Sequence, residues 1–264
     1  MSSLPARTGL EWLKQGFGLF RQQPGILTML LFANFLGSVL LSAVPVIGTL
    51  ATIVLIPVFS IAIMQACNLI AQGQRVMPDV LLTGFRKPAV THLLKLGMVY
   101  VGVALIMFIA MRLSVDESAV QQMQASAEAA KAASQAGTPV TPPQYPGTLL
   151  FLVLLWSIVM LLMSFATPLT YWKEMPLLKA IFYSVFGVVG AFKPILVMLL
   201  SAMGMFMVLI LFLRLLFGGS ALVFQAVIAW SSLMFTLVLQ CAMFASYRQI
   251  FGDPAPGIKP PVVW

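Results

Sequence analysis

The chain has 264 residues, of which 61% are hydrophobic and only 8% are Asp, Glu, Lys or Arg. A water-soluble domain has about a quarter of its residues charged, so this composition excludes a soluble globular protein and predicts a membrane protein. The net charge of +8 does not indicate a nucleic-acid partner, because the cations lie in small groups beside apolar runs rather than along one continuous face.

Six apolar runs are each near the ~20 residues that a helix needs to cross a bilayer core. They cover residues 25–43, 46–71, 91–112, 148–171, 195–217 and 221–247. A tight turn at Val44-Pro45 joins the first two runs, Gly218-Gly219-Ser220 joins the last two, and a polar segment, 113–147, separates the middle pair. We therefore expect one all-α polytopic transmembrane bundle of about six spans in three hairpins.

The positions of the cations predict the orientation, because short cytoplasmic loops are enriched in Lys and Arg. With the amino terminus inside, twelve of the fifteen cations fall on the cytoplasmic side. These are Arg7, Lys14, Arg21, Arg75, Arg86, Lys87, Lys95, Lys173, Lys179, Lys193, Arg248 and Lys259. Only Arg112, Lys131 and Arg214 remain outside. We expect a bacterial inner-membrane protein with both termini in the cytoplasm and segment 113–147 in the periplasm.

A pattern of aromatic residue, cation and proline precedes each odd-numbered span. It reads Phe20-Arg21-Gln22-Gln23-Pro24, then Phe85-Arg86-Lys87-Pro88, then Phe192-Lys193-Pro194. Proline can begin a helix in its first turn, while the cation and the aromatic ring suit the headgroup level. Unrelated span entrances also carry this pattern, but its regular placement favours a short interfacial helix before each hairpin. Arg21, Arg86, Lys87 and Lys193 are then interfacial cations.

Two of these leading segments allow more specific predictions. The first has capping-box spacing at Thr8 and Glu11, which predicts a helix start there. The third, 177–192, is apolar but only sixteen residues long and contains Lys179. We expect it to be an interfacial or partly sunken helix. The alternative, a seventh span, places the carboxyl terminus outside and removes the charge asymmetry.

Side chains suited to catalysis or metal binding are sparse. His92 is the only histidine and has no acidic or cysteine neighbour in sequence. Cys67 and Cys241 lie far apart within apolar runs, as expected of buried apolar thiols rather than a disulfide or metal site. The sequence has no zinc spacing, Walker loop or dinucleotide fingerprint. We therefore expect no enzyme, no catalytic, metal-binding or cofactor-binding residues, and no cofactor.

Uncharged polar residues inside the spans are candidates for a polar cluster. Five amides lie there, namely Asn34, Gln65, Asn68, Gln225 and Gln240. Such amides usually hydrogen-bond between helices, for about 1 kcal/mol each; lining a path for a neutral solute is the alternative. Pro57 and Pro168 lie within the second and fourth spans, where each removes a backbone hydrogen bond and can kink its helix. Broken helices at matched positions point to transporter sites, although plain bundles contain them too.

A resemblance adds to this reading. The segments Val44-Pro45-Val46-Ile47-Gly48, Gly73-Gln74-Arg75-Val76-Met77-Pro78 and Gly84-Phe85-Arg86 form a pattern that resembles a family of uncharacterised multi-pass inner-membrane proteins of Gram-negative bacteria. More distantly, it looks like the membrane domains attached to some glycerophosphodiester phosphodiesterases, whose metal-binding acids this chain lacks. The resemblance covers roughly the first 100 residues best, and it implies fold and location alone.

Two functions remain open at this point. The favoured one is a non-enzymatic integral membrane scaffold that interacts with membrane lipids, a membrane-protein partner or a second copy of itself. The alternative is a permease or channel for a small neutral or lipidic solute, with a cavity near Pro57 and Pro168. A permease requires the amides to line one continuous cavity, whereas a scaffold is packed solid.

Overall fold

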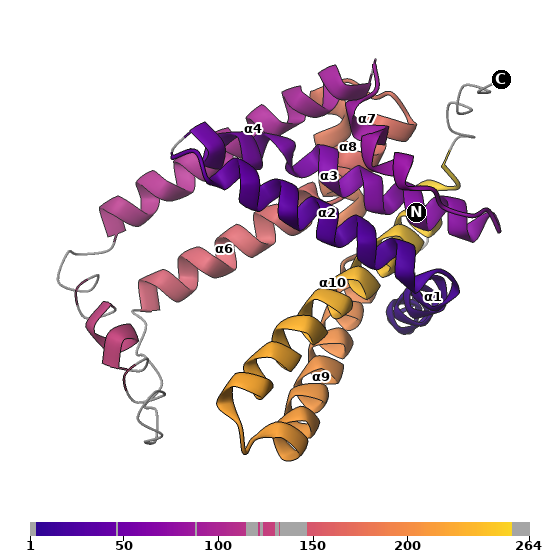
Figure 1. Cartoon of the computed structure of the whole chain (residues 1–264). Helices are drawn as coiled ribbons and strands as arrows, with labels where there is room; N and C mark the ends of the chain where they lie inside the picture. Colours follow the sequence, from indigo (N-terminus) through magenta and orange to yellow (C-terminus); the bar gives the residue numbers. More distant parts are fainter. Residues whose placement is uncertain are drawn as a thin grey trace. The chain divides into compact units, whose positions relative to one another are not determined.

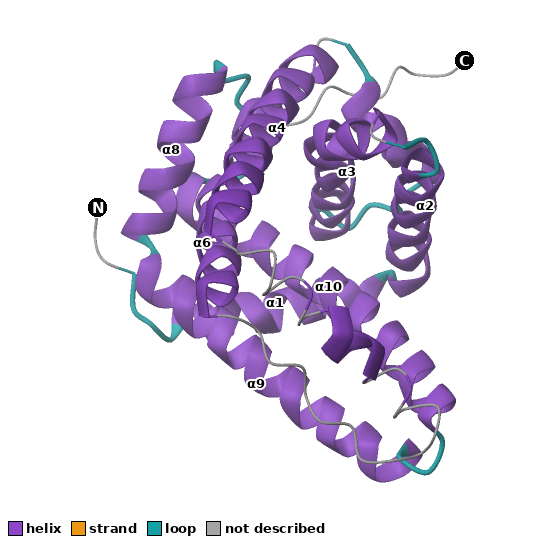
Figure 2. Ribbon diagram, turned by 90° about the vertical axis from the view of Figure 1, so that its left-hand side faces the viewer, coloured by secondary structure: helices purple, strands orange, loops and turns teal. Residues whose placement is uncertain are grey.

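The described part of the protein is almost entirely helical. The computed structural model describes residues 4–45, 47–87, 89–114, 121, 124–129, 132 and 147–254, and these form helices and loops without a strand (Figures 1 and 2). Six segments of this described part are long and apolar enough to cross a membrane. They are α2 (Pro24–Ser42), α3 (Ile47–Ala71), α4 (Ala89–Ser114), α6 with α7 (Gly147–Met163 and Ala166–Trp172), α9 (Phe192–Phe217) and α10 (Ala221–Phe251). The predicted all-α fold with six spans is confirmed.

The chain divides into two compact units. The larger contains residues 1–99 and 162–264, and the smaller contains residues 100–161. The smaller unit holds most of α4 and most of α6, whose exposed faces carry large apolar side chains such as Ile106, Phe108 and Phe151. Most of segment 113–147, predicted to be periplasmic, lies outside the described residues, as do Lys131 and Lys259.

The core of the larger unit lies where α3, α7 and α10 meet. Ile61 and Cys67 of α3 are fully buried, as are Cys241 and Phe244 of α10. The sulfur atoms of the two cysteines lie 2.8 Å apart, so residues 174 positions apart bring α3 against α10. Beside them the rings of Trp172 and Tyr247 lie 4.9 Å apart between centroids. Both cysteines are free thiols, as predicted from the sequence, but nothing in the sequence indicates that they meet.

Helix α1 (Thr8–Gln22) lies against both helices of the last hairpin, α9 and α10 (Figure 1). Two glycines permit this approach. A Cβ atom at Gly9 meets the backbone of Pro194 on α9, and a Cβ at Gly16 lies 2.6 Å from the Ala242 nitrogen on α10. Seven residues of helix span about 10.5 Å, which is close to the 8–10 Å that separates packed helices. Trp12 lies between the two glycines, about one helical turn from each. It is fully buried and donates a hydrogen bond to Gln249.

The fourth span is interrupted near Pro168. Helix α6 ends at Met163 and α7 begins at Ala166, because a proline at 168 has no N–H to donate to the carbonyl of Ser164 and its ring crowds that carbonyl. One side chain bonds two backbone groups at this interruption. The Ser184 hydroxyl accepts a hydrogen bond from the Phe165 N–H at 3.1 Å and donates one to the Leu162 carbonyl at 2.6 Å. By contrast, α3 continues through Pro57 as one helix.

The three leading segments take three different forms. The first is α1, whose cap residue is Arg7; Thr8 lies inside the helix and makes no side-chain cap bond, so the capping-box prediction is wrong. The second is η1 (Pro78–Phe85), a 3₁₀ helix packed on α3. The third is α8 (Leu177–Gly190), whose 14 residues span about 21 Å. A bilayer core is about 30 Å thick, so α8 is too short for a seventh span.

Candidate functional site

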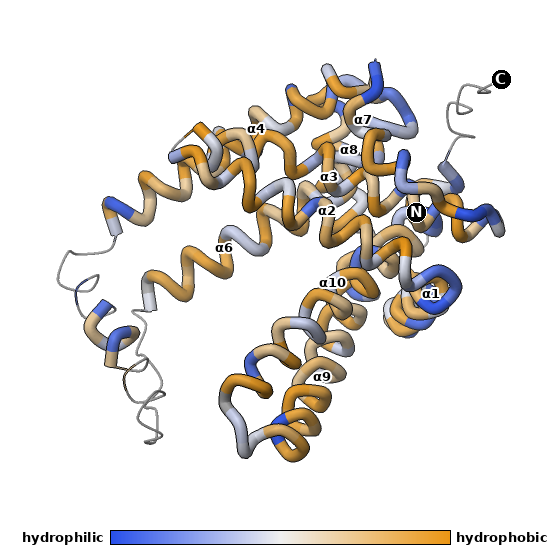
Figure 3. The backbone as a smooth tube through the Cα atoms, viewed as in Figure 1, coloured by the Kyte–Doolittle hydropathy of each residue, from blue (hydrophilic) through white to orange (hydrophobic). Residues whose placement is uncertain are grey.

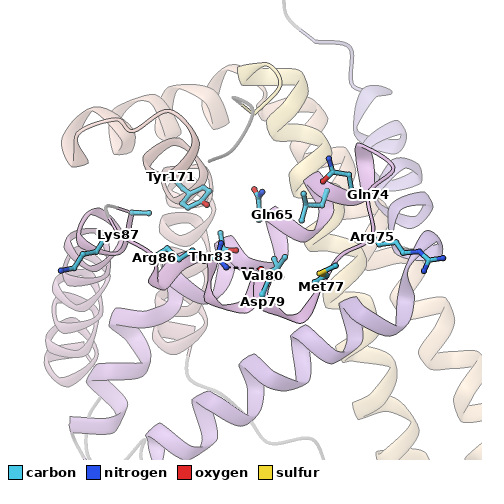
Figure 4. Close-up of a pocket in the computed structure, with 12 residues that line it drawn as sticks. Gln65, Gln74, Arg75, Met77, Asp79, Val80, Thr83, Arg86, Lys87 and Tyr171 are labelled. Carbon is cyan, nitrogen blue, oxygen red and sulfur yellow. Dashed lines mark hydrogen bonds and ion pairs between the residues drawn. The ribbon is translucent and has the colours of Figure 1, made fainter. Parts of the chain in front are cut away.

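A cavity of about 450 Å³ lies between α3, η1, the start of α4 and the end of α7, within the larger unit (Figure 4). We call it the basic cavity. Its lining residues are Gln65, Leu69, Gln74, Arg75, Met77, Asp79, Val80, Thr83, Arg86, Lys87, Ala89 and Tyr171. Most of them belong to the connection between α3 and α4. The shape of this connection therefore decides what the cavity can hold.

The connection begins with a defined helix end. Gly73 has φ +73, a left-handed conformation that favours glycine. The N–H of Gly73 bonds to the Ile70 carbonyl, and the N–H of Gln74 bonds to the Leu69 carbonyl at 2.9 Å. This pair of hydrogen bonds is a Schellman motif. It ends α3 and turns the chain back toward the side of the helix.

A glutamine between α1 and α2 holds the next residues in place. Gln23 donates a hydrogen bond from Nε2 to the Gln74 carbonyl at 2.7 Å, and its Oε1 accepts one from the Val76 N–H at 3.0 Å. Pro78 then begins η1 in its first turn. Gly84 lies so close to α3 that a Cβ atom there falls 2.7 Å from the Val58 carbonyl oxygen. The connection is thus fixed at both ends, which preforms one wall of the cavity.

The charge of the cavity is positive. Its described lining contains three cations and one carboxylate. Arg86 pairs with Asp79 at 3.1 Å, and their side chains are 46% and 50% exposed, so this ion pair stabilises the fold by at most about 1 kcal/mol. Figure 4 shows the pair on the cavity floor, with Arg75 and Lys87 at opposite ends and their side chains extending outward. Neither Arg75 nor Lys87 has an ion pair within the described part of the chain.

Amide and aromatic groups form the wall opposite η1. Gln65 accepts a hydrogen bond at Oε1 from the Trp172 indole N–H at 2.9 Å, which orients its amide and ties α3 to α7. The Tyr171 ring also lines the cavity (Figure 4). The arrangement offers cations at two ends, a hydroxyl and amide donors between them, and apolar contacts from Leu69 and Val80. Such a lining is suited to an anion that carries an apolar portion.

The structure places the five predicted amides in separate surroundings. Gln65 lies in the basic cavity, and Asn68 lines a different cavity of about 240 Å³. Asn34 donates a hydrogen bond to the Phe59 carbonyl on α3 at 3.3 Å, which is the bond between helices expected of such amides. Gln225 is exposed and Gln240 is half-buried, both on α10. No described cavity is lined by more than one of the five amides.

The four predicted interfacial cations are all exposed. Arg21 lies in the last turn of α1, and Lys193 lies at the start of α9. Arg86 and Lys87 belong to the basic cavity, so two of the four come together. The described residues include no group of three or more His, Cys, Asp and Glu side chains that could hold a metal ion.

Sequence reasoning missed three parts of this site. Gln23 and the Arg86–Asp79 pair had no recognisable signal, because each depends on contacts between residues of different segments. Tyr171 was hidden in the apolar run of the fourth span. The loop glycine and proline, Gly73 and Pro78, were visible in the resemblance but had no assigned role.

Comparison with known proteins identifies a relative but no activity. The chain is 32% identical over 259 residues to a probable inner membrane protein of Burkholderia thailandensis, and the match covers 96% of this chain and 94% of that protein. No protein-family model matches the chain, and no solved structure matches it. Identity at this level over nearly the whole of both chains establishes that this chain, which has six apolar helices long enough to cross a membrane, belongs to the family of that probable inner membrane protein of a Gram-negative bacterium.

Proposed function

We propose that this protein is a non-enzymatic membrane protein that binds phosphate-bearing headgroups of anionic lipids in the basic cavity. The observation that carries the proposal is the cavity lining, in which Arg75 and Lys87 lie at opposite ends of the Arg86–Asp79 pair and have no carboxylate partner among the described residues. Arginine forms paired hydrogen bonds to phosphate oxygens. Each cation near an anionic membrane surface contributes about 1 kcal/mol.

The proposal requires the cavity to face the cytoplasmic leaflet. The α3–α4 connection carries three of the cations that predict this orientation, and the connection after α7 carries Lys173. Reporter fusions after Arg75, Lys173 and Lys259 should therefore read cytoplasmic. One periplasmic reading among the three contradicts this topology and removes the reason for anionic lipid at the cavity.

The alternative of a permease receives less support. Its amides are spread over α2, α3 and α10 rather than around one described cavity. At the interruption near Pro168, the Phe165 N–H and the Leu162 carbonyl are both bonded to Ser184, so these two groups are not free to contact a solute. Transport of a solute past Gln65, which lines the basic cavity, is one outcome of the experiment below.

The test removes the charges of Arg75 and Lys87 and compares the effect on lipid binding with that of removing two cations elsewhere in the protein. The variant is Arg75→Gln with Lys87→Gln, and the matched control is Arg112→Gln with Arg214→Gln, at the other ends of their spans. Native mass spectrometry from micelles doped with phosphatidylglycerol or phosphatidylcholine counts the bound lipids. Two cations at about 1 kcal/mol each predict roughly 30-fold weaker phosphatidylglycerol binding in the first variant only.

Each result has a distinct meaning. Equal lipid binding by both double variants refutes the proposal. Competition by inorganic phosphate at low concentration identifies a soluble phosphate compound rather than a lipid as the ligand. Uptake of a neutral solute by reconstituted protein, abolished by Gln65→Leu, favours the permease instead.

A further inference from the structure

A second hollow of the larger unit lies away from the basic cavity and shares no residue with it. It has a volume of about 1050 Å³ and is formed by α1, α9 and α10. We call it the apolar groove. Leu10 and Phe17 of α1 overhang it, and Met205, Val208 and Phe212 of α9 form much of its length. Figure 3 shows that α9 and α10 are hydrophobic along most of this stretch, whereas α1 also carries hydrophilic residues.

The close seating of α1 creates this groove. Gly9 and Gly16 hold one face of α1 against α9 and α10, and Trp12 and Leu13 are buried there. Leu10 and Phe17 lie on the neighbouring face and are 42% and 48% exposed. These large apolar side chains are directed into the angle between α1 and the hairpin rather than onto a helix. An exposed pair of this kind at a span end indicates contact with lipid.

The groove has a direction. Helix α1 contacts α9 around Pro194 and Met198, close to its first residue, Phe192. The α9 residues that line the groove begin at Ser201 and end at Phe212, which is about 17 Å along a helix. The groove therefore begins near the end of α9 that α1 covers. Its length of about 17 Å is slightly more than half of the bilayer core, which is about 30 Å thick. This length and direction suit a hydrocarbon chain that lies parallel to α9.

Charge distinguishes the two ends of the groove. Among the described residues that line it, Lys14 is the single charged side chain, and it belongs to α1. Lysine carries a compact charge on a flexible apolar stem, so its ammonium group can reach the headgroup level while its stem covers the groove. An anionic headgroup beside Lys14 and an acyl chain along α9 complement this distribution together.

The groove also has space where a side chain is missing. Gly204 lines it, and a Cβ atom built there meets nothing within 4 Å. A side chain at this position therefore begins in open space and would occupy part of the groove. We propose that the apolar groove binds one acyl chain of an anionic glycerophospholipid, whose phosphate is held by Lys14. This site goes beyond the proposed function, because it selects the chain of a lipid as well as its charge.

The test blocks the groove with Gly204→Leu and uses Gly102→Leu as the matched control. Gly102 lies in α4, and its Cβ likewise meets nothing within 4 Å. The full-length protein is transferred to micelles doped with phosphatidylglycerol of one defined chain length, and native mass spectrometry measures the most tightly held lipid. Gly204→Leu should bind this lipid at least about tenfold more weakly, because an overfilled groove excludes it. Gly102→Leu should bind it as the unaltered protein does.

Variants at Lys14 separate charge from chain binding. Lys14→Gln should reduce the preference for phosphatidylglycerol over phosphatidylcholine about fivefold, and Lys14→Arg should restore it. The Arg75→Gln and Lys87→Gln double variant should lose the lipid of the basic cavity but still hold one phosphatidylglycerol molecule, which adding Gly204→Leu should remove. Failure of the basic-cavity proposal therefore leaves this test intact. Equal losses in the two leucine variants mean annular lipid only and overturn the inference. A dimer that disappears in Gly204→Leu overturns it as well, in favour of self-association.

Discussion

The close contact between α1 and α10 makes a quantitative prediction about two neighbouring glycines. Gly16→Ala places a Cβ atom 2.6 Å from the Ala242 nitrogen and 2.8 Å from the Val238 carbonyl oxygen. Gly18→Ala, two residues along the same helix, places its Cβ where nothing lies within 4 Å. The first substitution should loosen α1 from the hairpin. The second should leave the contact unchanged.

The magnitude follows from what the two variants share. Both replace glycine by alanine within α1, so both gain the same helix propensity, about 1 kcal/mol. That gain cancels when one variant is compared with the other. What remains is the overpacking at Gly16, where ordinary contact begins at 3.4 Å and the helices must separate by about 0.8 Å. Overpacking against rigid backbone costs about 1–3 kcal/mol.

Proteolysis measures this difference directly in lipid nanodiscs. Trypsin cleaves after Lys14 only when α1 opens, because a helical backbone does not fit a protease cleft. When opening is fast, the cleavage rate follows the population of the open state. A difference of 1–3 kcal/mol corresponds to about 5- to 150-fold faster cleavage in Gly16→Ala than in Gly18→Ala. Equal rates refute the close packing of α1 on α10, and with it the geometry of the apolar groove.

Two further predictions concern buried contacts of the larger unit. Ser184→Ala removes the partner of two backbone groups at the interrupted fourth span. It should lower the free energy of unfolding by about 1–3 kcal/mol, measured as a lower thermal midpoint. Ser157→Ala, which loses one bond within its own helix, should change the free energy of unfolding little. Mild oxidation by copper–phenanthroline and oxygen should join Cys67 to Cys241, whose sulfurs lie 2.8 Å apart. Intact mass after denaturation should show the loss of two hydrogens, and alkylation of both thiols after oxidation contradicts the contact between α3 and α10.

The sequence predicted the spans well because hydropathy is a local property. A long apolar run is stable in lipid as a helix whose backbone hydrogen bonds are made within the run. The six spans could therefore be predicted without knowing how they pack. The interfacial positions of Arg86 and Lys87 could also be predicted, because a basic residue at the start of a span needs no tertiary partner. The basic cavity as a whole could not be predicted, because Asp79 and Tyr171 line it from two separate segments and Gln23, from a third, holds its wall in place.

Contacts between distant segments had weaker signals. Nothing in the sequence marks Gly9 and Gly16 as contact residues. Their separation along α1 matters only because it matches the distance between α9 and α10, which they approach. Cys67 and Cys241 looked independent because their positions are 174 residues apart. The Thr8 capping prediction failed for a related reason. Thr8 is buried in a helix that packs on α9 and α10, so tertiary packing decided its environment and the local motif did not.

The repeated motif of aromatic residue, cation and proline illustrates the same distinction. It precedes or opens α2, α4 and α9; Pro24 begins α2 and Pro194 lies in the first turn of α9, whereas Pro88 lies outside the described residues. The cations at these helix starts suit the headgroup level. The segments before these entrances nevertheless do different work, because they differ in length and in what they cover. Helix α1 packs along α9 and α10, the shorter η1 packs mainly on α3 and also contacts α2, and α8 supplies the hydroxyl that bonds the interrupted span. The motif therefore specifies where the chain enters the membrane, and the residues before it specify whether that entrance forms a groove, a cavity or a support.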